Sequence, residues 1–198
     1  MLLRLAFVAV IVIATITSVH HRRNADRTGG SLLRSPESRR FLGCLRVSAI
    51  ANWCSVLVYL LYPPAVAWAS LPLPRSLRWA GFVSATGCVG LMSWTLSSLG
   101  RNLADAAAIR SQAQLVTTGP YRWIRHPYYV TTLLLMTSAT VLTANGLVGL
   151  TSLLVLALLF SRTPHEEAML IQRFGDEYRA YATGTNRFFP SWKSIRGR

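Results

Sequence analysis

Two short polar segments, one on each side of a long apolar stretch, hold most of the side chains that could do chemistry. The first segment runs from Leu115 to Tyr129 and contains Arg125-His126-Pro127. Pro127 suits the first position of a helix, where free backbone N–H groups and the positive end of the helix dipole lie. Together with the Arg125 guanidinium, such a helix start can hold a carboxylate or a phosphate. The same residues would also serve as a basic and aromatic membrane anchor.

The second polar segment follows the apolar stretch and carries the paired acids Glu166 and Glu167. On a helix, Glu167 shares one face with a mostly apolar set at spacings of three and four, namely Leu170, Ile171, Phe174, Tyr178 and Tyr181. The two acids could also be favourable first-turn residues and no more. The stretch 128–160 between the segments is too long for one span, and Asn145-Gly146 divides it, which predicts a helical hairpin. A hairpin brings both polar segments to the same membrane edge.

The elements that must position these side chains are membrane helices. Three further apolar runs are 5–19, 47–68 and 79–99, of which the last two suit a span. The first has a length between that of a signal-peptide core and that of a full span, and we interpret it as a retained helix and not as a cleaved signal. The sequence therefore predicts an all-α integral-membrane bundle of about five transmembrane helices, a hairpin and an amphipathic cytoplasmic C-terminal helix. We expect one domain, 1–198, with N-terminal spans in 1–99 and a cofactor-binding region in 100–198.

Composition and charge support a membrane protein. The chain has 198 residues, of which 52% are hydrophobic, and 21 basic residues against 7 acidic ones give a net charge of +14. A nucleic-acid-binding protein of this charge would be more polar overall, so nucleic acid is not expected as a partner. The segments 20–46, 100–127 and 161–198 contain 18 of the 21 basic residues. This bias predicts an N-terminus outside and a site at the cytoplasmic face, with a bacterial inner membrane as the expected location.

The ordered motifs across the hairpin resemble those of a known family. They are Gly119-Pro120-Tyr121-Arg122, Arg125-His126-Pro127 with Tyr129, Glu166-Glu167, and Phe174-Gly175-Asp176-Glu177-Tyr178 followed by Tyr181 and Pro190. This pattern, from about Leu99 to Pro190, is similar to the isoprenylcysteine carboxyl methyltransferase family. The wider group includes integral-membrane phospholipid N-methyltransferases and thiol methyltransferases. One departure is Thr131, where the family often has glycine.

The resemblance implies S-adenosyl-L-methionine as the methyl donor, bound without a dinucleotide-binding fold. Transferred position by position, it implies cofactor contacts from Leu115, Val116, Gly119, Tyr121, Arg125, His126, Tyr129, Glu166 and Glu167. From the chemistry of the acceptors we expect catalytic roles for Glu167 and Arg173. Arg125 would grip the methionyl carboxylate, while Arg173 would orient an acceptor carboxylate.

The acceptor stays open among three classes that share these donor motifs. A prenylcysteine-like carboxylate is already ionised and needs a cation to orient it. The amine of phosphatidylethanolamine needs a proton acceptor, for which Glu167 or His126 would serve, and a small thiol needs a thiolate. A membrane reductase and a non-enzymatic lipid-binding scaffold are more distant alternatives. We expect a lipophilic or small-molecule acceptor and membrane lipid as partners, no obligate protein partner and no metal.

Overall fold

The computed structural model describes residues 1–34, 39–103 and 108–190. Five of the charged residues counted above, Glu37, Asp105, Lys193, Arg196 and Arg198, lie outside these ranges.

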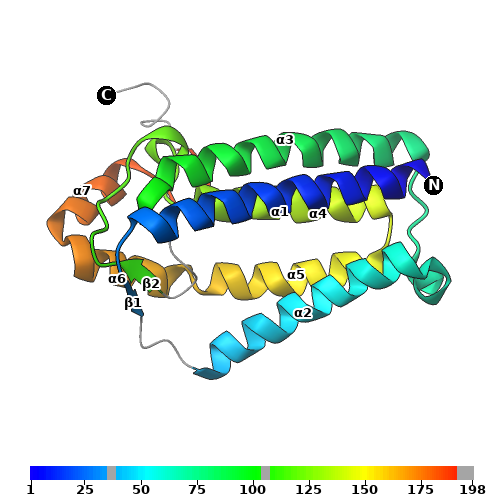
Figure 1. The fold of residues 1–198 in the computed structure, drawn as a ribbon, viewed down its shortest axis with the longest axis horizontal. Helices are drawn as coiled ribbons and strands as arrows, with labels where there is room; N and C mark the ends of the chain where they lie inside the picture. Colours follow the sequence, from blue (N-terminus) through cyan, green and yellow to red (C-terminus); the bar gives the residue numbers. More distant parts are fainter. Residues whose placement is uncertain (35–38, 104–107, 191–198) are drawn as a thin grey trace. The chain divides into compact units, whose positions relative to one another are not determined.

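Seven α-helices make up most of the described chain, which confirms the all-α prediction (Figure 1). They are α1 (Leu2–Thr28), α2 (Arg39–Leu61), α3 (Arg75–Leu99), α4 (Pro127–Thr143), α5 (Gly146–Ser161), α6 (Thr163–Phe174) and α7 (Asp176–Gly184). Short 3-10 helices are η1 (Pro63–Ala69), η2 (Gly100–Asn102) and η3 (Gly119–Arg122).

Four segments of the described chain are long and apolar enough to cross a membrane: Leu2–Thr28, Arg40–Leu61, Arg75–Asn102 and Gly146–Phe174. The protein is therefore an integral membrane protein. With 17 residues, α4 is short for a hydrocarbon core of about 30 Å. It is nevertheless the first arm of the predicted hairpin, and α5 is the second.

The hairpin turns at Asn145, as the sequence predicts. The Asn145 Oδ1 accepts hydrogen bonds from the backbone N–H groups of Leu147 and Val148 and so caps α5. Its Nδ2 donates to the Val66 carbonyl at 2.9 Å. Ala144, just before it, has a φ of 49°, a left-handed conformation that lets the chain reverse between two helices. Asn145 thus lies at the turn between the two arms, caps the start of α5 and binds the backbone of η1.

Contacts between residues divide the chain into two compact units, neither of which is continuous in sequence. Unit 1 comprises 1–15, 37–90 and 132–161, and unit 2 comprises 16–36, 91–131 and 162–198. The division of one domain into 1–99 and 100–198 stays a prediction.

Unit 1 is a helical core with a polar seam. In it α2 lies beside α5 (Figure 1), and the Asn52 amide donates to the hydroxyls of Thr151 and Ser152 at 3.1 and 2.9 Å. Hydrogen bonds of this kind join membrane helices where lipid offers no alternative partner. The buried cluster consists of Phe7, Val56, Tyr59, Val66, Leu142 and Val148.

Unit 2 contains a feature that the sequence did not predict, a two-stranded antiparallel pair of β1 (Leu32–Arg34) and β2 (Ala108–Arg110). Strands of three residues are too short to show an alternating pattern. The buried Arg110 guanidinium pairs with Asp26 and donates to the carbonyls of Leu103 and Gly30 at 3.0 and 3.1 Å. This arginine therefore has a structural role as well as its contribution to the charge bias.

Candidate active site

The candidate site lies in unit 2 and is built around the carboxylate of Glu167, on the first turns of α6. The side chain is buried, with 7% of the residue exposed. Its Oε1 accepts from Arg125 Nε at 2.9 Å and lies 3.3 Å from His126 Nε2. Its Oε2 accepts from Arg187 Nε and Nη2 at 2.9 and 2.6 Å. Two guanidinium groups and one imidazole thus compensate a single buried carboxylate, as a buried charge requires.

Backbone pairing brings Arg125 and His126 to this carboxylate. The Arg125 N–H donates to the Asn186 carbonyl at 2.9 Å, and the His126 N–H donates to the Arg187 carbonyl at 3.0 Å. These bonds dock the chain after α7 along the segment that leads into α4. Pro127 then begins α4, where its missing N–H leaves no unsatisfied donor. Glu167 on α6 and the Arg125-His126 pair before α4 therefore meet, as the hairpin predicted.

Arg125 is more fully engaged than the sequence suggested. Besides Glu167, it donates through Nη1 to the carbonyl of Ala182 at 2.9 Å and to that of Thr185. One planar guanidinium therefore binds a carboxylate and the chain at the end of α7 at the same time. Its geometry fits a residue that positions Glu167 and the C-terminal segment.

Glu166 points to a different neighbour than Glu167 because successive helical residues lie about 100° apart around the axis. It accepts a hydrogen bond from the Tyr129 hydroxyl on α4. Arg162, only 5% exposed at the start of α6, also interacts with this hydroxyl. The paired acids thus anchor two separate contacts between α6 and the N-terminal part of α4.

His126 is held in the neutral state by its surroundings. Burial lowers its pKa below the ordinary value, although the nearby carboxylates of Glu166 and Glu167 oppose this effect. The imidazole stacks on the Tyr129 ring, with centroids 5.3 Å apart and an interplanar angle of 20°. A flat aromatic surface therefore borders the carboxylates.

Two buried hydroxyls in unit 2 have no hydrogen-bond partner among the described residues: Tyr178 Oη and Thr163 Oγ1. Both residues are 2% exposed, and Tyr178 feels the charges of Glu167 and Arg125. Unsatisfied buried hydroxyls are costly, so the Tyr178 hydroxyl beside the charged cluster fits a site completed by a ligand.

Tyr121 and Tyr181 hold η3 against α7. The Tyr181 hydroxyl donates to the Tyr121 carbonyl at 2.6 Å, and burial raises the pKa of Tyr181 to about 12. Tyr121 is itself buried, which likewise raises its pKa. Both phenols are therefore neutral packing and hydrogen-bonding groups at ordinary pH.

The remaining predicted residues lie elsewhere in unit 2. Leu115 and Val116 are half-buried in the irregular stretch before η3. Gly119 has a φ of 60°, and a Cβ there would lie 2.2 Å from Ser98 Oγ, so the backbone itself requires glycine. Arg173 is exposed, and its described hydrogen bond is a 2.6 Å donation to the Ser111 carbonyl. The structure thus joins Arg125, His126, Tyr129, Glu166 and Glu167, whereas Arg173 lies apart from the contacts of this cluster.

Sequence reasoning missed two arginines, Arg162 and Arg187. Arg187 binds Glu167 through two nitrogens while 48% of its side chain stays exposed, so it faces both the cluster and solvent. Each looked like one of many cations in a basic C-terminal region. No spacing distinguished them, because the contact of Arg187 depends on how the segment after α7 docks and that of Arg162 depends on how α4 packs beside α6.

Comparisons with known proteins show which chains this one is similar to. The family model described as the isoprenylcysteine carboxyl methyltransferase (ICMT) family matches residues 83–172. The "Probable protein-S-isoprenylcysteine O-methyltransferase" of Oryza sativa subsp. japonica is 36% identical over 114 residues, which cover 52% of this chain and 60% of that protein. The cobalt-zinc-cadmium resistance protein CzcN of Cupriavidus metallidurans is 32% identical over 156 residues, covering 75% of this chain and 66% of that one.

A second resistance protein and a solved structure are also similar. The nickel-cobalt-cadmium resistance protein NccN of Alcaligenes xylosoxydans xylosoxydans is 34% identical over 110 residues, covering 54% of this chain and 51% of that protein. The chain thus spans about half to two thirds of the length of these curated relatives. The eukaryotic intramembrane Ras methyltransferase ICMT shares the fold at a TM-score of 0.52 and 21% identity, covering 79% of this chain and 54% of that one. Over residues 83–172 this chain belongs to the isoprenylcysteine carboxyl methyltransferase family.

Proposed function

We propose that this protein is an integral-membrane methyltransferase that transfers a methyl group from S-adenosyl-L-methionine to the carboxylate of a lipophilic, prenylcysteine-like acceptor. The observation that carries the proposal is the buried Glu167 cluster, in which Arg125 and His126 before α4 meet Arg187 after α7. Family membership supports the reaction class.

The residues of the cluster fit the proposed cofactor. S-adenosyl-L-methionine, when bound, supplies an electrophilic methyl group on a positively charged sulfur, together with a carboxylate, an amino group and ribose hydroxyls. The half-exposed Arg187 suits the carboxylate, and Glu166 suits the amino group or a ribose hydroxyl. The unpartnered hydroxyls of Tyr178 and Thr163 offer further hydrogen bonds. In this assignment Arg125 positions Glu167 and does not itself grip the methionyl carboxylate.

The electrostatics favour an acceptor that arrives already ionised. Both oxygens of Glu167 are held by guanidinium groups, which makes this carboxylate a weak base. His126 is neutral but buried, and its Nε2 lies within reach of Glu167. A carboxylate needs no deprotonation, so this site has only to align it and exclude water.

A binding and transfer assay tests the proposal. Detergent-solubilised protein is titrated with labelled S-adenosyl-L-methionine and then offered three acceptors: a prenylcysteine, phosphatidylethanolamine and a small thiol. We expect saturable binding and methylation of the prenylcysteine. Methylation of only the amine or the thiol would move the protein to another acceptor class. Saturable binding of a nicotinamide cofactor instead would favour a reductase, and lipid binding with no saturable cofactor site would favour a scaffold.

The same proposal places the N-terminus outside and the Glu167 cluster at the cytoplasmic face of a bacterial inner membrane. The support is the uneven distribution of basic residues. Reporter fusions at the two ends of the chain test this orientation. We expect activity when the C-terminus is fused to a reporter that works only in the cytoplasm. Activity of a C-terminal reporter that works only outside the cytoplasm would reverse the assignment.

A further inference from the structure

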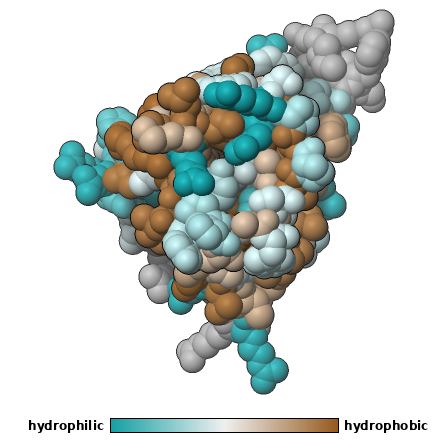
Figure 2. All heavy atoms as spheres, turned by 90° about the vertical axis from the view of Figure 1, so that its right-hand side faces the viewer, coloured by the Kyte–Doolittle hydropathy of each residue, from teal (hydrophilic) through white to brown (hydrophobic). Residues whose placement is uncertain are grey.

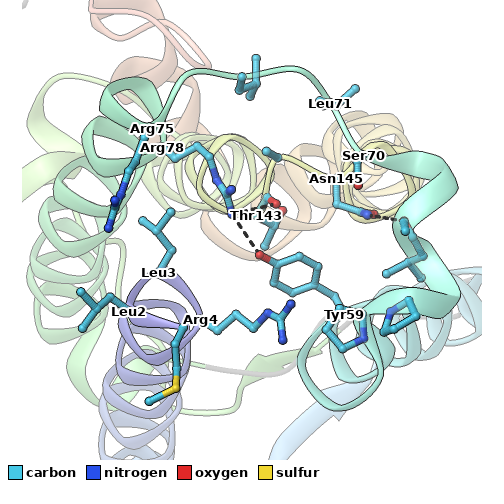
Figure 3. A pocket seen from close by; sticks show the side chains of 17 residues that line it. Leu2, Leu3, Arg4, Tyr59, Ser70, Leu71, Arg75, Arg78, Thr143 and Asn145 are labelled. Carbon is cyan, nitrogen blue, oxygen red and sulfur yellow. Dashed lines mark hydrogen bonds between the residues drawn. The ribbon is translucent and has the colours of Figure 1, made fainter.

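Unit 1 contains a cavity of about 1010 Å³ that the proposed methyl transfer does not use. Its walls come from the start of α1, the end of α2, η1, the segment leading into α3, and the turn between α4 and α5 (Figure 3). All of its lining residues belong to unit 1. Three of them are arginines, Arg4, Arg75 and Arg78, and the lining contains no aspartate or glutamate.

Arg78 forms the fixed part of this cavity. Its Nε donates to the Leu142 carbonyl at 3.0 Å, and its Nη2 donates to the Thr143 carbonyl at 3.4 Å and to the Tyr59 hydroxyl at 3.3 Å. Carbonyls at the C-terminal end of a helix lack intrahelical partners and carry the negative end of the dipole. Arg78 therefore has a structural role, because it caps the C-terminal end of α4 and also orients Tyr59.

Arg4 and Arg75 are the cations that remain available. The Arg4 guanidinium lies 5.9 Å from the centre of the Tyr59 ring, and in Figure 3 Arg4 and Arg78 both point toward this tyrosine. Arg75 is exposed at the first residue of α3. The only acid within the ranges of unit 1 is Glu37, which lies outside the described residues. The described part of unit 1 therefore supplies no carboxylate to balance these charges.

Apolar side chains lie among the polar ones around the arginines, which favours a lipid over a free anion. Leu2, Leu3, Leu71 and Leu73 also line the cavity. Beside it, Leu61, Tyr62 and Trp68 are 80%, 65% and 76% exposed, as expected of side chains that contact lipid. Figure 2 shows this face, where hydrophilic side chains gather around a hollow and hydrophobic ones surround them.

We propose that this cavity binds the headgroup of an anionic phospholipid, with Arg4 and Arg75 as the cations that attract its phosphate and with its acyl chains along the exposed apolar side chains. Guanidinium groups bind phosphate oxygens bidentately, and the apolar rim accommodates a molecule that is charged at one end only. The site is independent of the methyl-transfer proposal, because none of its residues belongs to the Glu167 cluster.

Lipid binding to the purified full-length chain tests the site. The protein is placed in nanodiscs of phosphatidylcholine with increasing phosphatidylglycerol, and retained phosphatidylglycerol is counted by native mass spectrometry after gentle release. The test variant is Arg4→Gln/Arg75→Gln. The control variant is Arg40→Gln/Arg46→Gln, which removes two exposed cations of unit 1 that do not line the cavity. Inorganic phosphate is a separate arm for a soluble anion.

An arginine beside an anionic headgroup contributes about a fivefold preference, so the test variant should bind phosphatidylglycerol about 25-fold more weakly. The control should retain most of the binding, and Arg4→Lys/Arg75→Lys should recover part of it. If the double glutamine variant does not fold, Arg75→Gln alone should show about a fivefold loss. Equal losses in the test and control variants would overturn the site. If inorganic phosphate stabilises the protein as much as phosphatidylglycerol does, the assignment of the cavity to a lipid would be overturned.

Discussion

Arg125 and Glu167, 42 residues apart in sequence, are joined by a 2.9 Å hydrogen bond from Nε to Oε1, and Arg125 also binds the carbonyls of Ala182 and Thr185. One side chain therefore links the start of α4, the acidic turn of α6 and the end of α7. Because Arg187 binds the other oxygen of Glu167, docking of the C-terminal segment and formation of the candidate site are coupled.

Glu167→Gln should destabilise the protein. The substitution leaves the cation of Arg125 facing a neutral amide in a largely buried setting, and removal of one partner from a buried pair typically costs about 3 kcal/mol. Thermal or denaturant unfolding in detergent measures the change in free energy of unfolding. The control Glu177→Gln, at an exposed position of α7, should change it by less than about 0.5 kcal/mol. Equal effects would contradict a central role for Glu167.

Arg125→Lys should weaken cofactor binding even though it keeps the charge. Lysine lacks the planar fork that reaches Glu167 and two carbonyls at once. We expect roughly a tenfold or greater rise in the dissociation constant of S-adenosyl-L-methionine, equivalent to about 1.4 kcal/mol or more. Arg179→Lys, where the exposed arginine pairs with Asp176 at 2.7 Å, is the matched control. An unchanged affinity in Arg125→Lys would argue against this positioning role.

Tyr129→Phe and Glu166→Gln should not have additive effects on stability. The Tyr129 hydroxyl donates to the Glu166 carboxylate, and hydrogen bonds to charged groups contribute about 1.5–3 kcal/mol. A double-mutant cycle should therefore give a coupling energy of about 1 kcal/mol or more. A control cycle combines Tyr129→Phe with Glu177→Gln, and the effects of these two substitutions on stability should be additive. A coupling near zero in the first cycle would show that the contact contributes little.

His126 should make stability depend on pH. Burial lowers its pKa in the folded protein below the ordinary value of 6.5, while Glu166 and Glu167 raise it and Arg125 lowers it. Between the pKa of His126 in the folded protein and its pKa of about 6.5 in the unfolded chain, the unfolded chain binds more protons. The free energy of unfolding therefore rises with pH in this window. It is lost as the pH falls through about 6.5 toward the folded pKa. His126→Gln should lose less free energy of unfolding between pH 7 and 5 than the wild type.

The exposed His165 on α6 supplies the control for this pH effect, since His165→Gln should keep the wild-type profile. A profile of His126→Gln that matches the wild type would place the titration elsewhere.

Gly119→Ala should destabilise the protein by more than a helical glycine substitution does. At Gly119 a Cβ would overlap Ser98 Oγ and the φ of 60° is unfavourable for alanine, so we expect a loss of about 1 kcal/mol or more. Gly87→Ala within α3, where nothing lies within 4 Å of a Cβ, should be neutral or slightly stabilising because alanine favours helices. Equal effects of the two on the melting temperature would contradict the turn geometry.

Much of the fold followed from local chemistry. Apolar length predicted the helices, and Pro127 predicted the start of α4. Helix boundaries were less accurate: α1 continues through the polar residues 20–28, beyond the apolar run 5–19. Arg125, His126, Glu166 and Glu167 could be chosen because a hairpin brings its two ends together. The three-residue strands were not predictable, since their pairing joins segments about 75 residues apart.

The membrane class, the hairpin and the acidic and cationic segments that meet beside it follow from the sequence, because apolar periods, turns and spacing are properties of neighbouring residues. The partner of each charge depends instead on the tertiary structure. It assigned Arg125 and Arg187 to Glu167, Arg110 to Asp26, and Arg4, Arg75 and Arg78 to one cavity. A guanidinium on a flexible side chain can reach many positions, so its partner depends on which distant backbone packs beside it.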